Sequence, residues 1–367
     1  MKQYTTDGKV VHLSKSEDIN SKLSRFIGKK YDDYRVKWDK ANKFELVTEF
    51  PLFLHLDMNQ KCNFKCPHCI VADEKLIEDY YNGDSLTFDE YTNIIDEGKD
   101  YGCPSVSVQG NNEPLLNKDL EKYIKYAADN NFIDIMLNSN ASALTTERAK
   151  SLLDSGLTRI RFSIDAYSKE VFDKIRISIN PRANDLGLFN KVIRNIENFL
   201  DIKAQGGYKL PITGVSFCRQ KDNQHEEQEF ISFWEDKVDS VSIQKYIPPV
   251  LEPGYEKFYS DDQKNSSTEF SGFKCVQPFQ RVVIKNSEIT PCCTMFSSRL
   301  KIGDTRKGAI YDAWHSEEMN ELRDLHRKGE WYKNEICKQC VNLMYPESIG
   351  IETALQGQQK GLGLINI

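Results

Sequence analysis

The chain has 367 residues, of which 39% are hydrophobic and 28% are charged, and its net charge is −6. These values are typical of a globular protein that can hold a barrel-sized core and a smaller appended domain. The acidic balance predicts no nucleic-acid partner and no membrane partner, and no apolar run is long enough to cross a bilayer. Because the N-terminus has no apolar signal segment, we expect a cytoplasmic protein.

From about residue 52 to 247, segments typical of strands alternate with segments typical of helices. Thr87 and Glu90 form a capping box that predicts the start of one helix. Repeated β-α units predict a parallel sheet, and six strands are too few for a closed eight-stranded barrel. The expected fold is therefore α/β, a partial (β/α)6 TIM-like barrel. Its strands are expected at 53–58, 106–109, 133–137, 159–164, 212–217 and 241–246.

The rest of the chain divides into shorter parts. Residues 1–51 form an N-terminal extension, and 52–247 the barrel. A stretch rich in proline and polar residues, 248–272, is expected to be a linker. Residues 273–345 are expected to form a small β-hairpin/helix domain, with a hairpin at 281–290 that turns at Asn286-Ser287 and a helix at 309–327. A C-terminal tail, 346–367, follows.

Ten cysteines are unevenly placed along the chain. Because disulfides are rare in reducing compartments, their clustering predicts two separate metal sites. Cys62, Cys66 and Cys69 form a C-x3-C-x2-C run after the first expected strand, at the catalytic end of a β/α barrel. A structural zinc site uses four ligands, whereas three thiolates on a cubane cluster leave one iron open. The alternative is a zinc site that borrows His55 or His68.

This run resembles the C-x3-C-x-aromatic-C motif of the radical S-adenosylmethionine (SAM) superfamily, with His68 at the aromatic position near adenine. The resemblance implies a [4Fe–4S] cluster whose open iron binds SAM, and a 5′-deoxyadenosyl radical that abstracts hydrogen from a substrate carbon. The cofactor then supplies the chemistry, and the protein positions it. The resemblance also implies an electron donor such as flavodoxin or ferredoxin.

The ends of other expected strands also match the family. Gln109-Gly-Asn-Asn-Glu113-Pro resembles the Gly-Gly-Glu-Pro-like segment that binds the methionine amine, and a carboxylate suits that role. The family contacts ribose and the methionine carboxylate from the following strands. Each position is also compatible with an ordinary capping or turn residue. The candidate cofactor-binding residues are His68, Gln109, Gly110, Asn112, Glu113, Asn138, Ser163, Asp165 and Arg176.

The second set of cysteines flanks the expected hairpin. On spacing alone, a zinc ribbon and an iron–sulfur site are both compatible with it. Residues 302–340 resemble the SPASM/twitch extension of radical SAM enzymes, which holds auxiliary [4Fe–4S] clusters. Because no cysteine follows Cys340, the resemblance implies the shorter twitch form with one auxiliary cluster. Its expected ligands are Cys275, Cys292, Cys337 and Cys340, and Cys293 could replace Cys292.

Four thiolates leave no open iron, so the auxiliary cluster is suited to electron transfer and favours net oxidation of the substrate. The layout resembles twitch-type dehydrogenases of amino-cyclitols and SPASM proteins of polysaccharide pathways. We therefore expect oxidation of an alcohol to a carbonyl on a small-molecule substrate, a sugar, cyclitol or nucleotide-sugar metabolite. The alternative is crosslinking or epimerisation of a peptide or protein, with Cys218 or Cys293 as hydrogen donor. A zinc scaffold without catalysis is the third class.

Overall fold

The computed structural model describes residues 2–4, 10–13, 18–59, 61–80, 85–180, 182–250, 254–261 and 273–344. The expected C-terminal tail and much of the expected linker lie outside these ranges. Among the residues with a described position, no helix has the length and apolar composition needed to cross a membrane.

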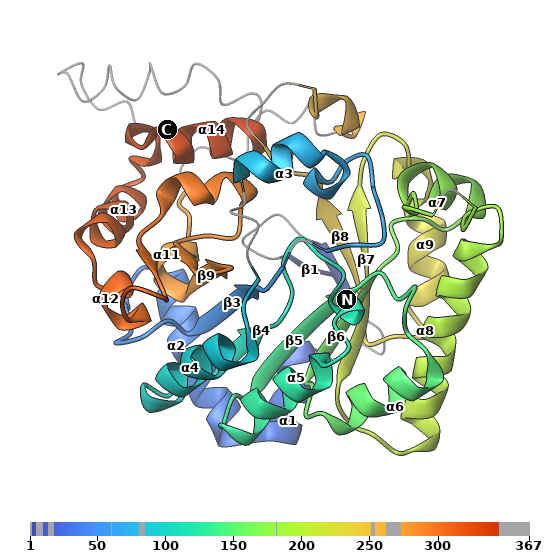
Figure 1. The fold of residues 1–367 in the computed structure, drawn as a ribbon, viewed down its shortest axis with the longest axis horizontal. Helices are drawn as coiled ribbons and strands as arrows, with labels where there is room; N and C mark the ends of the chain where they lie inside the picture. Colours follow the sequence, from blue (N-terminus) through green and yellow to red (C-terminus); the bar gives the residue numbers. More distant parts are fainter. Residues whose placement is uncertain are drawn as a thin grey trace.

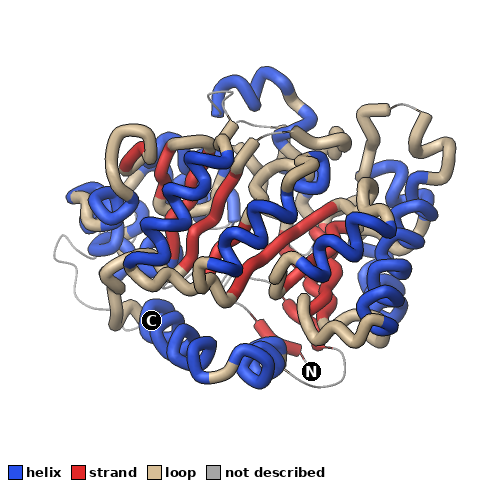
Figure 2. Tube along the Cα trace, turned by 60° about the horizontal axis from the view of Figure 1, so that its bottom comes forward, coloured by secondary structure: helices blue, strands red, loops and turns tan. Residues whose placement is uncertain are grey.

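One sheet of eleven strands organises the described part of the chain, in the order β1-β2-β8-β7-β6-β5-β4-β3-β9-β10-β11. Six parallel strands, from β3 to β8, lie side by side in sequence order at its centre. The first and last of them, β3 and β8, do not pair with each other, as they would in a closed barrel. The sheet is therefore open, and the predicted partial (β/α)6 barrel is confirmed (Figure 2). These strands are β3 (Phe53–Asp57), β4 (Ser105–Ser107), β5 (Asp134–Ser139), β6 (Arg159–Ser163), β7 (Ile212–Arg219) and β8 (Ser240–Lys245).

Helices cover the outer face of these strands (Figure 1). Apolar side chains of the strands, such as Leu54, Ile135 and Phe162, are fully buried between the layers, as parallel sheets require. The first outer helix begins after Thr87, whose side chain and that of Glu90 form the predicted capping box. The outer helices are α4 (Phe88–Asp100), α5 (Leu120–Asp129), α6 (Thr146–Asp154), α7 (Lys169–Ile175), α8 (Leu188–Gln205) and α9 (Glu227–Trp234).

The N-terminal segment covers one end and one edge of the barrel. Helices α1 (Ile19–Ile27) and α2 (Lys29–Asn42) pack against Leu52 and Ile212, at the amino ends of β3 and β7. Lys22 of α1 forms an ion pair of 2.8 Å with Asp239, just before β8. Strands β1 (Lys2–Tyr4) and β2 (Val10–Leu13) form a hairpin, and β2 pairs antiparallel with β8. This pairing covers an edge that an open barrel would otherwise expose.

The C-terminal hairpin extends the barrel sheet at the other edge. Strands β9 (Arg281–Lys285) and β10 (Glu288–Thr290) turn at Asn286-Ser287, as predicted, and β9 pairs in parallel with β3. The short β11 (Gly303–Asp304) completes the sheet.

The helices of this region are short. The predicted helix at 309–327 is instead two helices, because Ser316 caps a new helix through a 3.2 Å hydrogen bond from Met319 N–H. The C-terminal helices lie on the left of Figure 1, and α3 crosses the top. These helices are α3 (Glu74–Tyr80), α11 (Gln277–Gln280), α12 (Ile310–Trp314), α13 (Glu317–Lys328) and α14 (Glu335–Met344).

Candidate functional site

Three cysteines lie on the loop that follows β3, at the carboxyl edge of the sheet. Cys66 is buried, and Cys62 and Cys69 are half-buried. The loop is tight, because Cys69 N–H donates to Cys66 O over 2.9 Å and Phe64 N–H donates to Cys62 Sγ over 3.4 Å. Burial, with a smaller contribution from the nearby charge of Cys66, raises the pKa of Cys62 to about 12 and that of Cys69 to about 11. The three thiols therefore form one group, whose protons a metal would displace on binding.

Hydrogen bonds fix this loop to the neighbouring strand ends. Ile179 N–H donates to Asn63 O over 3.0 Å, from the segment that follows α7. The Asn63 side chain donates to Ser142 Oγ (2.8 Å) and accepts from Asn140 (3.0 Å), both of which follow β5. The position of the cysteines thus depends on segments far away in the sequence.

A buried charged group lies beside Cys66. The Arg176 guanidinium forms an ion pair of 2.6 Å with Asp165, and its other nitrogen lies 3.8 Å from Cys66 Sγ. The second Asp165 oxygen accepts from Cys218 N–H over 2.8 Å. His68 Nε2 lies 4.0 Å from Asp165, but this is not an ion pair, because burial and then the Arg176 charge lower the pKa of His68 to about 3. The structure thus brings three predicted residues together around Cys66.

Glu113 is buried between the end of β4 and the end of β5. Its Oε1 accepts from Ser139 Oγ (2.7 Å) and Leu115 N–H (3.1 Å), and its Oε2 accepts from Asn140 N–H (2.6 Å). Burial raises the pKa of Glu113, and these hydrogen bonds oppose that shift. The Glu113 charge also raises the pKa of Cys62, so the carboxylate lies near the cysteine group.

The segment before Glu113 approaches the end of β3 closely. Gln109 is buried, and its Oε1 accepts from Asn138 N–H over 3.2 Å. Gly110 N–H donates to Asn112 Oδ1 over 3.2 Å. A side chain at Gly110 has no room, because a Cβ atom there would lie 1.9 Å from Asp57 Cγ. Glycine at this position is therefore required by the packing of the backbone on Asp57.

Residues at the ends of β6, β7 and β8 have different surroundings. Ser163 is half-buried at the end of β6. Cys218 is also half-buried and packs against a cluster that contains Tyr246. Tyr246 Oη donates to His68 O over 3.3 Å, whereas Arg219 forms an ion pair of 2.5 Å with a glutamate of α9. Tyr246 therefore belongs to the surroundings of the first cysteine loop, and Arg219 is held by the outer helix.

The second set of cysteines converges from three segments. Cys275 precedes α11, Cys292 and Cys293 follow β10, and Cys337 and Cys340 lie on α14. Burial and, to a smaller extent, the charge of Cys292 together raise the pKa of Cys275 to about 12. Burial, together with the charges of Cys292 and Cys275, also raises the pKa of Cys337 and of Cys340. Cys293 is exposed, whereas the other four are half-buried.

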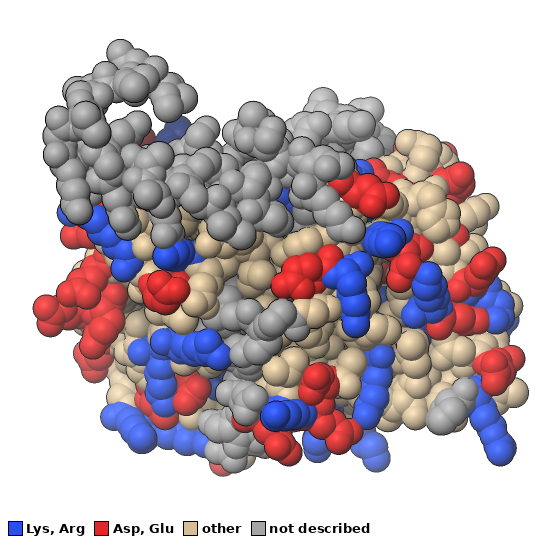
Figure 3. Space-filling model, turned by 90° about the horizontal axis from the view of Figure 1, so that it is seen from above, with Lys and Arg blue, Asp and Glu red and all other residues tan. Residues whose placement is uncertain are grey.

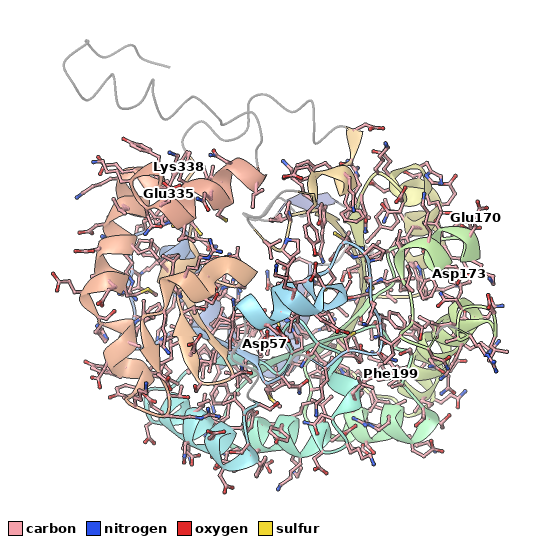
Figure 4. The ribbon with its side chains drawn as sticks, turned by 45° about the horizontal axis from the view of Figure 1, so that its top comes forward. Asp57, Glu170, Asp173, Phe199, Glu335 and Lys338 are labelled. Carbon is pink, nitrogen blue, oxygen red and sulfur yellow. The ribbon has the colours of Figure 1, made fainter. Side chains whose placement is uncertain are left out.

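The two sets of cysteines are connected by packing. Ile70, directly after Cys69, is fully buried in a cluster that includes Cys340 and Ile336 of α14. A second connection runs through the sheet, where Asp57 of β3 and Lys285 of β9 are register partners. In Figure 4, Asp57 lies near the middle of the face, and Glu335 and Lys338 of α14 lie toward its upper left.

Comparison with known families identifies both regions. Residues 57–215 match the radical SAM superfamily, and residues 275–341 match SPASM, an iron–sulfur cluster-binding domain. The chain carries a radical SAM domain and a SPASM domain. The radical SAM domain implies a [4Fe–4S] cluster and SAM, and the SPASM domain implies an auxiliary iron–sulfur cluster, as the sequence predicted.

Curated relatives of the radical SAM domain include several named GTP 3′,8-cyclase. The one from Desulforamulus reducens is 25% identical over 178 residues, which is 48% of this chain and 50% of the relative. The one from Aliarcobacter butzleri is 27% identical and is covered to 63% of its length. The one from Campylobacter jejuni RM1221 is 24% identical over 76% of this chain and 91% of its own length. The chain thus spans between about half and nine-tenths of these relatives.

Solved structures share the fold at low sequence identity. The crystal structure of BtrN in complex with AdoMet and 2-DOIA has a TM-score of 0.51 and 14% identity, and covers 80% of this chain and 94% of its own. Streptococcus suis SuiB bound to the precursor peptide SuiA has a TM-score of 0.59 and 16% identity. The match covers 86% of this chain and 75% of the SuiB chain. At these identities the likeness concerns the fold alone.

The donor sets fit the implied groups. The radical SAM domain offers three grouped thiols, and the SPASM domain offers four half-buried thiols with a fifth at the surface. Within the described ranges, no three cysteine, histidine or acidic side chains stand at the spacing of a single metal ion. In a cluster each thiolate binds its own iron, so the ligands lie further apart than around one ion.

Sequence reasoning assigned no role to several residues of this region. Asp57 is a charged residue at the end of an apolar strand, which is a detectable signal at a catalytic barrel edge. Lys285 is likewise a charged residue at the end of an apolar strand, but a lysine at a strand end is a weaker indication of a functional site than an aspartate at the catalytic barrel edge. The roles of Asn63 and Ile70 depend on contacts with distant segments, and no pattern in the sequence reports them.

Proposed function

We propose that this protein is a radical SAM oxidoreductase that converts an alcohol of a small, carbohydrate-like substrate to a carbonyl, with the auxiliary cluster as electron acceptor. When bound, SAM and its cluster supply the 5′-deoxyadenosyl radical that removes the substrate hydrogen. The observation that carries the proposal is the set of four half-buried thiols in the SPASM domain, of which Cys340 packs in one cluster with Ile70, directly after Cys69. Such a set leaves no iron open for a substrate and favours electron transfer.

We assign the cluster ligands on burial and grouping. Cys62, Cys66 and Cys69 are assigned to the SAM-binding cluster. Cys275, Cys292, Cys337 and Cys340 are assigned to the auxiliary cluster. Cys292 is preferred to Cys293, because it is half-buried and its Sγ lies 3.3 Å from Thr294 Oγ1, whereas Cys293 is exposed.

We assign three tasks to the residues around the first loop. Glu113, oriented by three donors, is assigned to accept the amino group of SAM. Asp165 and Arg176 form a fixed ion pair beside Cys66 and are assigned to the polar parts of SAM. The ring of His68, which packs edge-on against Tyr246 and Phe258, is assigned to the surroundings of the adenine as a neutral imidazole. Gln109, Gly110, Asn112, Asn138 and Ser163 complete the proposed SAM site.

Reduction of the first cluster needs an external donor, and we propose a flavodoxin or a ferredoxin. On the face seen in Figure 3, basic and acidic side chains are intermixed over the described surface.

The decisive experiment combines iron analysis with product analysis. The full chain, reconstituted without oxygen, should bind about eight irons, as two [4Fe–4S] clusters require. With a chemical reductant it should release 5′-deoxyadenosine. A panel of sugars, cyclitols and nucleotide sugars in deuterated water should then yield a product lighter by one H2, with no deuterium from solvent. Iron near zero with stoichiometric zinc would refute the radical chemistry.

The same assay separates the competing reactions. The relatives named GTP 3′,8-cyclase, one of them covered to 91% of its length, favour a purine nucleotide as the second candidate substrate. GTP therefore belongs in the panel, and a cyclised product of unchanged mass would replace our proposal. Stable deuterium at a stereocentre of a peptide or sugar would indicate epimerisation, with half-buried Cys218 as the first thiol to mutate.

A further inference from the structure

Lys285 is a buried cation between the two cysteine sites. It ends β9 with only 3% of its surface exposed, and its Nζ donates to Thr294 O (2.9 Å) and Ser297 Oγ (3.0 Å). Burial lowers the pKa of Lys285, and the nearby negative charges of Cys292 and Asp57 oppose that shift. A lysine is rarely buried without a functional or ionic reason.

The surroundings of Lys285 lead directly to one proposed cluster ligand. Thr294, whose carbonyl accepts from Lys285, also places its hydroxyl 3.3 Å from Cys292 Sγ. Once Cys292 binds iron as a thiolate, that hydroxyl can only donate to the sulfur. Lys285 and Cys292 are therefore connected through a single residue, and Lys285 itself is buried away from water.

On its other side, Lys285 faces the radical SAM domain. It is the register partner of Asp57, whose charge in turn raises the pKa of Cys69. A row of groups thus runs from Cys69 through Asp57 and Lys285 to Cys292. Within this row Lys285 is the basic member, and its ammonium group donates to Thr294 and Ser297, which follow Cys292 in the chain.

We propose that Lys285 is a positioning residue that acts through Cys292 to raise the reduction potential of the auxiliary cluster. The inference rests on the proposed function and concerns its last step. Net charge and hydrogen bonds to the sulfurs set the potential of an iron–sulfur cluster. Reduction adds one negative charge, and a buried cation nearby stabilises it more strongly than an exposed cation that water and salt would screen.

This potential would drive the last electron transfer of the alcohol oxidation. The substrate carbon gives one hydrogen atom to the 5′-deoxyadenosyl radical. The substrate radical then forms its carbon–oxygen double bond, while the hydroxyl proton leaves to water and one electron passes to the auxiliary cluster. The substrate is oxidised to the carbonyl, and the auxiliary cluster is reduced by one electron. A higher potential at the acceptor makes this transfer more favourable.

The test is a redox titration of the reconstituted full chain, followed by electron paramagnetic resonance. Lys285→Met should lower the midpoint potential of the auxiliary cluster by at least 59 mV, which is a tenfold change in a one-electron equilibrium. Lys285→Arg keeps the charge and should stay near the wild type. Lys301→Met is the matched control, because Lys301 lies in the same domain, is 38% exposed and pairs with Glu288. It should leave both potentials unchanged.

Each outcome decides the inference. An unchanged auxiliary potential in Lys285→Met, with full iron content, overturns it. If the methionine variant loses iron, Lys285→Gln retains a donor for Thr294 O without the charge, and its potential decides in the same way. If both neutral variants lose the cluster and only Lys285→Arg keeps it, Lys285 serves assembly and the tuning role is refuted. A wild type with about four irons refutes the proposed function itself.

Discussion

The close approach of Gly110 to Asp57 gives the sharpest quantitative prediction. In Gly110→Ala, the new Cβ would lie 1.9 Å from Asp57 Cγ and 2.3 Å from its Cβ, where contacts under 3.0 Å do not occur. About 1 Å of relative movement is therefore required. Asp57 cannot rotate away freely, because it is buried and accepts from Asn111 N–H over 3.3 Å. The backbone of the proposed SAM-binding segment must shift instead.

Two effects of this substitution oppose each other. Alanine restricts the unfolded chain and stabilises by about 0.4–1 kcal/mol where the site has room. Overpacking in a buried site costs about 1–3 kcal/mol, and a contact this short places Gly110→Ala at the upper end. We expect the free energy of unfolding to fall by about 2 kcal/mol. A displacement of about 1 Å in a catalytic segment can reduce the rate on the order of 100-fold, and we expect that loss in 5′-deoxyadenosine release.

Urea unfolding and anaerobic SAM cleavage measure the two effects. Gly308→Ala is the matched control, because Gly308 is exposed and a Cβ there meets no atom within 4 Å. It should leave cleavage unchanged and stability unchanged or slightly higher. If Gly110→Ala matches the wild type in both stability and cleavage, the packing of this segment on Asp57 does not control SAM binding and the reasoning is wrong.

Three further predictions concern other contacts. Arg176→Met leaves the Asp165 carboxylate buried without its cation and should cost about 3–5 kcal/mol in urea unfolding at neutral pH, of which the double variant with Asp165→Asn should recover most. Ile70→Ala should lower the free energy of unfolding by about 2–5 kcal/mol. Because it loosens the contact with α14, it should also slow product formation more than SAM cleavage. Equal slowing of both would contradict a coupling of the two cysteine sites through Ile70. Burial alone would raise the pKa of Asp239, but hydrogen bonds from Lys22 and from Thr213 of β7 lower it below the usual value. The ionised Asp239 therefore stabilises the fold above about pH 4, and this stabilisation is lost as the pH falls. Asp239→Asn should therefore flatten the acid limb of a stability–pH curve, and an unchanged limb would exclude this pair as its cause.

The fold class and the thiol donors could be predicted from the amino-acid sequence alone. Short apolar runs separated by segments of helical spacing predicted the parallel strands and their helices, because a strand buried on both faces is apolar throughout, whereas a helix buried on one face has a period of 3.6 residues. The grouping of Cys62, Cys66 and Cys69 is local, so their spacing alone indicated a three-thiol site. The hairpin at Asn286-Ser287 was likewise readable from local turn chemistry.

How the two domains meet could not be predicted from local sequence patterns. That β9 pairs with β3 is a long-range choice, since both strands are apolar and nothing local selects their partners. This pairing places Lys285 beside Asp57 and brings Ile70 under α14, next to Cys340. The contrast between Cys292 and Cys293 was also invisible in the sequence, because two adjacent cysteines differ only in which side of the chain the fold buries. The radical SAM site was therefore legible in the sequence, whereas its connection to the auxiliary site comes from the fold.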